Sequence, residues 1–156
     1  KIGFTAKDYA NRHHGGYLGI RGSYEHLASA AAVVRRYIEE SSDGYVSGRQ
    51  LTCREIFELS YSGDKVAKKI VDENAEIVGI GIANLISIFA PEIIILGGGM
   101  TGARESYLSA IRKSAFENSL ENCRSEVKIG KALLGADASL LGSAYHALVR
   151  LAGKSI

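Results

Sequence analysis

The chain has 156 residues, 46% of them apolar, and a single proline, so it can form one domain with a real core and is no disordered tail. Its formal net charge of +2 gives no reason to expect binding to nucleic acid or to an anionic membrane. Cys53 and Cys123 lie far apart and form no C-x-x-C pair, which favours a reduced, cytoplasmic setting and excludes a zinc site made of cysteines.

Residues 1–22 contain five glycines and no sustained helical period, so we interpret this stretch as irregular, with one short strand or helix at most. The adjacent His13 and His14 would point apart in a helix or a strand, and we interpret both as loop residues rather than metal ligands. We expect no signal peptide. Because the chain opens on Lys1 in the middle of a pattern, we expect it to be a piece of a longer protein.

Three helices are predicted before residue 91. The first covers residues 23–40, with Ser23 as its N-cap and apolar residues at intervals of three and four. Thr52 and Glu55 match a capping box that opens a short second helix. The third covers residues 65–89; its first half is amphipathic, and its second half is apolar nearly all round and should be buried. The apolar run is shorter than the ~20 residues of a membrane span.

Gly79 and Gly81 lie inside the third predicted helix, where each costs ~1 kcal/mol relative to alanine. Residues 78–82 also alternate between glycine and apolar side chains, as a strand would. We prefer the helix because the 3.6-residue period continues from Ala67 without a break. The two glycines would then let another backbone, or a ligand, come close to the helix.

Residues 91–102 have the strongest functional signal. Four consecutive branched aliphatic residues follow Pro91 and Glu92, which predicts a strand buried on both faces. Gly97, Gly98 and Gly99 come next and allow a sharp turn with no Cβ atoms over it. A helix that starts just after this turn would aim free N–H groups at it, and ligands bind beyond the carboxyl ends of parallel strands. We therefore predict a nucleotide site at this turn.

The rest of the chain alternates helix and strand. Residues 104–118 predict an amphipathic helix, residues 126–132 a strand, and residues 138–151 a last helix capped by Asp137. This alternation favours a parallel sheet with right-handed crossovers. Two strands make a small sheet, so either residues 1–22 contain further strands or a missing part of the chain completes the sheet.

Two other interpretations of the turn compete with this prediction. Gly97, Gly99 and Gly102 satisfy G-x-G-x-x-G, but a dinucleotide site also needs an acidic residue about 20 positions on, at the end of the next strand. That position falls near Glu117 or Glu121, in or just after a predicted helix, so this interpretation fails its second test. A turn with a purely structural role would also explain the glycines.

Four segments in order provide a more specific signal. The first is residues 19–29, which match the pattern C-G-x-x-G-C-L-E-x-x-A-S in part, and the second is Ile56-Phe57-Glu58-Leu59 with Gly63-Asp64 and Ala67. The third runs from residue 79 through Pro91-Glu92 to Gly99, and the fourth is residues 134–144, which are similar to the pattern L-G-x-x-A-x-L-x-G-A-A. Together they resemble the C-terminal part of the ROK family of bacterial sugar kinases and sugar-responsive repressors. The resemblance covers nearly the whole chain.

The resemblance implies an α/β fold: residues 1–156 would form a single domain, the C-terminal portion of an actin-like, ribonuclease H-like ATPase, helix-rich with a small sheet. It implies that Gly97, Gly98 and Gly99 lie against the adenosine of ATP, bound with Mg²⁺, and that Glu25 binds hydroxyls of a sugar substrate. A carboxylate accepts charge-assisted hydrogen bonds from hydroxyls, which suits that role. The alternative for Glu25 is an acid that complements a helix dipole, worth ~0.3–1 kcal/mol. A homodimer is expected by resemblance only.

Some positions depart from the family pattern. Lys1 and Phe4 stand where the family has a sugar-binding glutamate and a histidine that binds sugar and zinc, and Ser23 replaces a cysteine. We therefore expect no structural zinc, and a pocket for a different sugar or for none. A catalytic aspartate and the phosphate loops belong to the family's N-terminal lobe, so we assign no catalytic residue and expect this chain alone to be inactive. The alternatives are a sugar-responsive regulator, which alone would bind nucleic acid, and an oligomerisation scaffold.

Overall fold

The computed structural model describes residues 23–41, 45–46, 49–124 and 126–153. The predictions made for residues 1–22, including those on Lys1, Phe4 and the histidine pair, lie outside the described residues. The elements run in the order α2 (Tyr24–Ala28), α3 (Ala30–Glu40), β1 (Tyr45–Val46), β2 (Arg49–Gln50), α4 (Cys53–Tyr61), α5 (Lys65–Phe89), β3 (Ile93–Leu96), the 3-10 turn η1 (Gly99–Gly102), α6 (Glu105–Asn118), α7 (Glu121–Arg124), β4 (Lys128–Lys131), η2 (Gly135–Asp137) and α8 (Ala138–Leu151).

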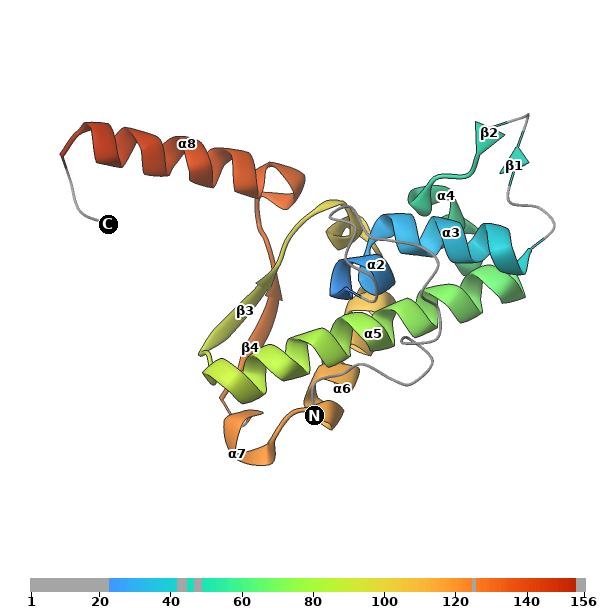
Figure 1. Ribbon diagram of the computed structural model, residues 1–156, viewed down its shortest axis with the longest axis horizontal. Coiled ribbons are helices and arrows are strands. Elements are labelled where there is room, and N and C mark those ends of the chain that lie inside the picture. The colour runs from blue at the N-terminus through green and yellow to red at the C-terminus, as the bar shows by residue number, and fades with distance from the viewer. Residues whose placement is uncertain (1–22, 42–44, 47–48, 125, 154–156) are drawn as a thin grey trace.

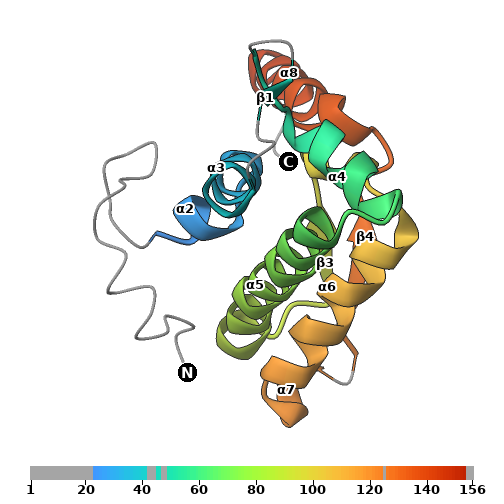
Figure 2. The same ribbon diagram turned by 90° about the vertical axis from the view of Figure 1, so that its right-hand side faces the viewer.

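The long helix α5 is the spine of the molecule, and α6 lies along it (Figures 1 and 2). Its predicted start is confirmed, because the side chain of Asp64 accepts a hydrogen bond from the backbone N–H of Ala67 at 2.7 Å. The capping box of α4 is confirmed too, with Thr52 and Glu55 each bonding the backbone of the other. The helix predicted over residues 23–40 is two helices, because Ser29 has an extended backbone and its side chain caps α3.

The two glycines of α5 allow close packing: Gly79 admits another backbone, as predicted, whereas Gly81 faces a side chain instead. A Cβ atom on Gly79 would lie 2.4 Å from the Cβ of Ser114 and 2.8 Å from the backbone oxygen of Ile111, both on α6. The hydroxyl of Ser114 donates to the backbone oxygen of Glu76 at 2.9 Å, so a hydrogen bond joins the helices at the same place. A Cβ on Gly81 would meet the ring of Tyr24 at 2.3 Å. The neighbours are thus a backbone and an aromatic ring, both from this chain.

The predicted parallel sheet is confirmed for two strands. β3 pairs with β4 in parallel, with Ile93 opposite Lys128 and Leu96 opposite Lys131, and α6 makes the crossover between them. α6 is tied to β4 by the side chain of Arg112, which donates to the backbone oxygen of Ile129 at 3.0 Å. A small antiparallel hairpin, β1 with β2, lies between α3 and α4.

The prediction that β3 is buried on both faces is wrong. Ile93 and Ile95 are 53% and 62% exposed, because helices cover only the face of the sheet that carries Ile94 and Leu96. The predicted burial of the second half of α5 fails at its end, where Phe89 is 70% exposed. The residues that stay uncovered on these elements and on α8 are Leu85, Ile88, Phe89, Ile93, Ile95, Leu140, Leu141, Tyr145, Leu148 and Leu151.

Helix α8 stands away from the rest of the fold (Figure 1). Its predicted bounds are confirmed, but no residue of it is buried, so its apolar stripe has no partner within the described residues. The predicted cap is wrong, because the side chain of Asp137 makes no capping hydrogen bond. The backbone of Asp137 is already helical, whereas a capping residue needs an extended backbone. No helix in the described part of the chain is long and apolar enough to cross a membrane.

A buried polar network ties three helices together. The amide of Asn74 on α5 is 1% exposed, donates to the backbone oxygen of Ala28 at 3.2 Å and accepts from the hydroxyl of Tyr107 at 2.6 Å. Ala28 ends α2 and Tyr107 belongs to the first turns of α6. The network therefore fixes α2, which carries Glu25, relative to the helix that follows the glycine turn.

Alkaline pH should destabilise the protein through Tyr107. Burial raises the pKa of its hydroxyl well above the ordinary range. Above about pH 10 the unfolded chain releases this proton while the folded protein keeps it, so the free energy of unfolding falls as pH rises. We expect a loss of about 1 kcal/mol from Tyr107 between pH 8 and pH 11. Denaturant unfolding at both pH values should show a smaller loss for Tyr107→Phe; an equal loss in both proteins would contradict this assignment.

Candidate functional site

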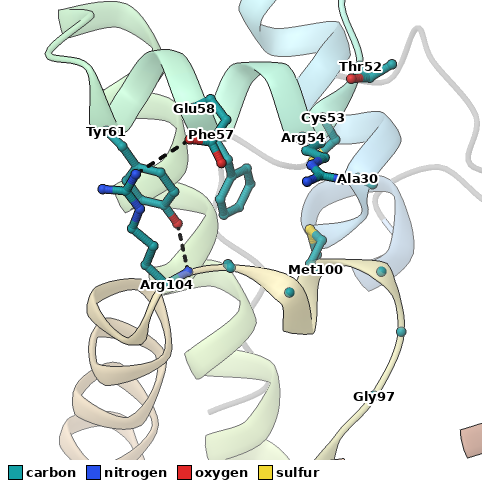
Figure 3. Close-up of a pocket in the computed structure, with 14 residues that line it drawn as sticks. Ala30, Thr52, Cys53, Arg54, Phe57, Glu58, Tyr61, Gly97, Met100 and Arg104 are labelled. Atoms are coloured by element: carbon teal, nitrogen blue, oxygen red, sulfur yellow. Dashed lines mark hydrogen bonds and ion pairs between the residues drawn. The ribbon is translucent and has the colours of Figure 1, made fainter. Parts of the chain in front are cut away.

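The glycine turn lies beside a cavity of about 690 Å³, which is within the usual size of small-molecule sites. The turn, formed by Gly97–Gly99 and η1, supplies one wall and α4 supplies the opposite wall (Figure 3). The residues that line it are Ala30, Thr52, Cys53, Arg54, Phe57, Glu58, Tyr61, Gly97, Gly98, Gly99, Met100, Gly102, Ala103 and Arg104. The three predicted glycines are thus brought to one cavity.

The geometry of the turn explains why glycine occupies it. Gly98 has φ +92° and ψ −179°, a backbone conformation that residues with a Cβ rarely adopt. Cβ atoms built on Gly97, Gly98 or Gly99 would meet nothing within 4 Å. The space over the turn is therefore open, and a flat ligand can approach its backbone. The turn follows β3 at its carboxyl end, where α/β sheets bind ligands.

The wall on α4 is positioned by the hydrogen bonds at the start of that helix. Arg49 reaches the carboxylate of Glu55 with two bonds, 3.0 and 2.5 Å long, and the backbone N–H of Thr52 donates to the same carboxylate at 2.8 Å. The bonds from Arg49, and then those from Thr52, hold the pKa of Glu55 well below its usual range. The carboxylate of Glu55 is therefore ionised and already bonded to Arg49 and Thr52, and Glu55 is not among the residues that line the cavity.

Aromatic and sulfur-containing side chains make the wall itself. Phe57 packs edge-to-face against Tyr61 and Tyr107, with ring centroids 6.2 and 4.9 Å apart. Cys53 is partly buried, and this burial raises the pKa of its thiol to about 11. The thiol is thus protonated near neutral pH and is a poor nucleophile. This part of the wall offers apolar contact rather than reactive groups.

At one end of the cavity, Arg104 contacts two side chains of α4 (Figure 3). The guanidinium of Arg104 stacks 4.1 Å from the centroid of the Tyr61 ring and lies 3.6 Å from the carboxylate of Glu58. The backbone N–H of Arg104 donates to the Tyr61 hydroxyl at 3.1 Å. Arg104 also occupies the N-cap position of α6, so these contacts hold the end of the glycine turn against α4.

The other predicted site residue lies elsewhere. Glu25 is exposed in the first turn of α2 and is no part of the cavity lining. Sequence reasoning missed the α4 wall, although the motif that contains Phe57 and Glu58 pointed to this helix. The dinucleotide interpretation finds no support, since Glu117 belongs to α6 and Glu121 to α7 rather than to the end of a strand.

Comparison with known proteins identifies the fold and the family. The structure of a ROK family glucokinase from Streptomyces griseus, in complex with glucose and AMPPNP, is similar with a TM-score of 0.69 and 32% identity, over 83% of this chain and 46% of that one. The fold is that of an actin-like ATPase lobe, as the sequence predicted. A model of the ROK family matches residues 2–150, and the chain belongs to the ROK family.

Two curated relatives show the range of the family. The glucokinase of Thermotoga maritima is 28% identical over 144 residues, which is 86% of this chain and 45% of that protein. The xylose repressor of Caldicellulosiruptor bescii is 30% identical over 131 residues, 80% of this chain and 33% of that protein. The chain therefore spans less than half the length of the curated relatives it matches.

Proposed function

We propose that this chain is the nucleotide- and sugar-binding C-terminal lobe of an ATP-dependent, hexose-type sugar kinase of the cytoplasm. The observation that supports it is the open cavity between α4 and the side-chain-free turn of Gly97, Gly98 and Gly99, on which adenine and ribose can lie. Relatives named as glucokinases, and one that binds glucose and AMPPNP, support the same activity. Mg²⁺ would neutralise the phosphates of ATP, and we assign no ligand for it to this chain.

Binding of ATP should weaken when Gly98 is replaced by valine. The new side chain would fill the space over the turn and would strain a backbone with φ +92°. We expect at least about a tenfold loss of affinity for Mg·ATP by calorimetry, equivalent to ~1.4 kcal/mol.

Gly63→Val is the matched control, because Gly63 has φ +99°, equally open surroundings and no place in the cavity lining. It should lose stability to a similar extent and keep its affinity for ATP. Wild-type protein that binds no ATP, or equal losses in both variants, would remove the support for a nucleotide site at this turn.

Glu25 is our proposed contact to the sugar hydroxyls, from the first turn of α2. Its carboxylate is exposed, as a ligand that must meet substrate has to be. The buried amide of Asn74, bonded to the end of α2, would hold this helix in place relative to α6. Which sugar binds depends on residues outside the described part of the chain, including Lys1 and Phe4.

A second candidate is a sugar-responsive regulator. It is favoured by the lysine and phenylalanine at positions 1 and 4, where the resemblance calls for sugar-binding residues, and by the similarity to a xylose repressor. Such a protein would bind DNA through a further domain and would exist as a dimer. A helix-turn-helix encoded upstream of Lys1 would decide for it, and an upstream phosphate loop with a catalytic aspartate would decide for the kinase.

The chain by itself should not phosphorylate sugars, because we propose that it is one lobe of two. The support is its length, less than half that of its relatives, and the apolar residues of β3, α5 and α8 that the described part of the chain leaves uncovered. A coupled assay with ATP and a panel of hexoses should give no turnover for these 156 residues and turnover once the upstream half of the gene is included. Turnover by this chain alone would contradict the two-lobe proposal.

A further inference from the structure

Two side chains face each other across the cavity from its opposite walls. Arg54 belongs to the first turn of α4, and Met100 belongs to η1, directly after the glycines. Both line the cavity, and Figure 3 shows Met100 reaching from the turn toward the side chain of Arg54. The space between them is continuous with the open space over Gly97–Gly99.

Arg54 has no ion pair or hydrogen bond within the described residues, although two carboxylates are close to it in sequence. Glu55 is held by Arg49 and by the backbone of Thr52. Glu58 pairs with Arg104 at the far end of the cavity. A positive charge in the first turn of a helix is also unfavourable, because the N-terminal end of the helix dipole is positive. Nothing in the described fold uses this guanidinium, yet it lines the cavity.

The neighbours of Arg54 show what kind of group it would meet. Ala30, Cys53, Phe57, Met100 and Ala103 give this part of the cavity an apolar lining. The raised pKa of the Cys53 thiol agrees with a poorly hydrated surrounding. An apolar slot suits a flat aromatic base better than a phosphate, which would lose its hydration there. A guanidinium plane stacks well on a π-face, and a thioether makes favourable contacts with aromatic rings.

We propose that Arg54 and Met100 hold the purine base of the bound nucleotide between them, with the guanidinium on one face and the thioether on the other. This inference rests on the proposed nucleotide-binding function and assigns two residues to it that neither the motifs nor the glycines identify. The ribose, which is attached to the base, would then lie over the glycine turn. Base recognition by stacking accounts for an arginine that has no partner in the described fold.

The sequence offers a direct probe, because Met100 is its single methionine. Protein labelled with ¹³C at the methionine methyl group should show one resonance, which adenosine should shift through the ring current of its base. Nuclear Overhauser effects should connect this methyl group to the base protons. Arg54→Gln should lower the affinity for adenosine and the affinity for ADP by the same factor, about tenfold, and Arg54→Lys should lower both by less. Arg150→Gln, on α8, makes the same change in charge away from the cavity and should change neither affinity.

Three results would overturn the proposal. A loss of affinity in Arg54→Gln that is confined to ADP would show that the guanidinium contacts phosphate instead of the base. Adenosine that binds by calorimetry without moving the Met100 resonance would place the base elsewhere and leave the nucleotide pocket standing. Wild-type protein that binds neither adenosine nor ADP would remove the proposed nucleotide function together with this inference.

Discussion

Replacing Gly79 with valine should lower the free energy of unfolding by about 3 kcal/mol or more, the upper range for overpacking a core. The side chain would collide with the Cβ of Ser114 at 2.4 Å and with the backbone oxygen of Ile111 at 2.8 Å. A backbone atom cannot rotate away, so α5 and α6 would have to separate along their contact. The hydrogen bond from Ser114 to Glu76 would then be lost as well.

Substitutions of two other glycines serve as comparisons for this result. Gly142→Val, on the exposed α8, should be close to neutral, because a Cβ there meets nothing within 4 Å. Gly81→Val should have an intermediate effect, since the obstacle is the far end of the Tyr24 side chain, which is 44% exposed. Moving this side chain outward would break, among the described residues, only the hydrogen bond that its hydroxyl donates to the backbone oxygen of Val78. Denaturant unfolding followed by circular dichroism gives all three values. If Gly79→Val were as stable as Gly142→Val, the close contact between α5 and α6 would be wrong.

Replacing Asn74 with leucine is expected to cost about 3 kcal/mol, although the two side chains have the same number and branching of heavy atoms. The backbone oxygen of Ala28 would lose its donor and the hydroxyl of Tyr107 its acceptor, both in the interior. An unsatisfied buried group costs about 1–3 kcal/mol, more than the bond contributes when it is made.

A double mutant tests that explanation. Tyr107→Phe removes the stranded hydroxyl, so Asn74→Leu with Tyr107→Phe should be less destabilised than the sum of the single variants, by about 1 kcal/mol. Strict additivity in denaturant unfolding would mean that the two side chains do not interact. Because the network holds α2, which carries Glu25, the proposed sugar contact, we also expect Asn74→Leu to weaken the proposed sugar binding more than the proposed ATP binding.

Local chemistry made much of the chain predictable. The capping residues Thr52 and Asp64 directly precede the helices they start, so the first residues of α4 and α5 follow from short-range hydrogen bonds. The branched aliphatic run gave β3, and the alternation of helix and strand gave its parallel pairing with β4. Burial was harder to predict: an apolar run indicates a tendency to be covered, and Ile93, Ile95 and Phe89 have no cover within the described residues.

The glycines of residues 97–99 and the ROK motifs were readable from the sequence alone, because a turn without side chains and an ordered set of short motifs are properties of the chain itself. The tertiary structure decided what faces the turn: α4, with Arg54, Phe57 and Tyr61, lies more than 35 positions earlier in the chain. It also decided that Gly79 admits a neighbouring helix and that Asn74 joins three of them. Contacts of this kind depend on how distant elements pack, and no local pattern of residues encodes which elements will meet.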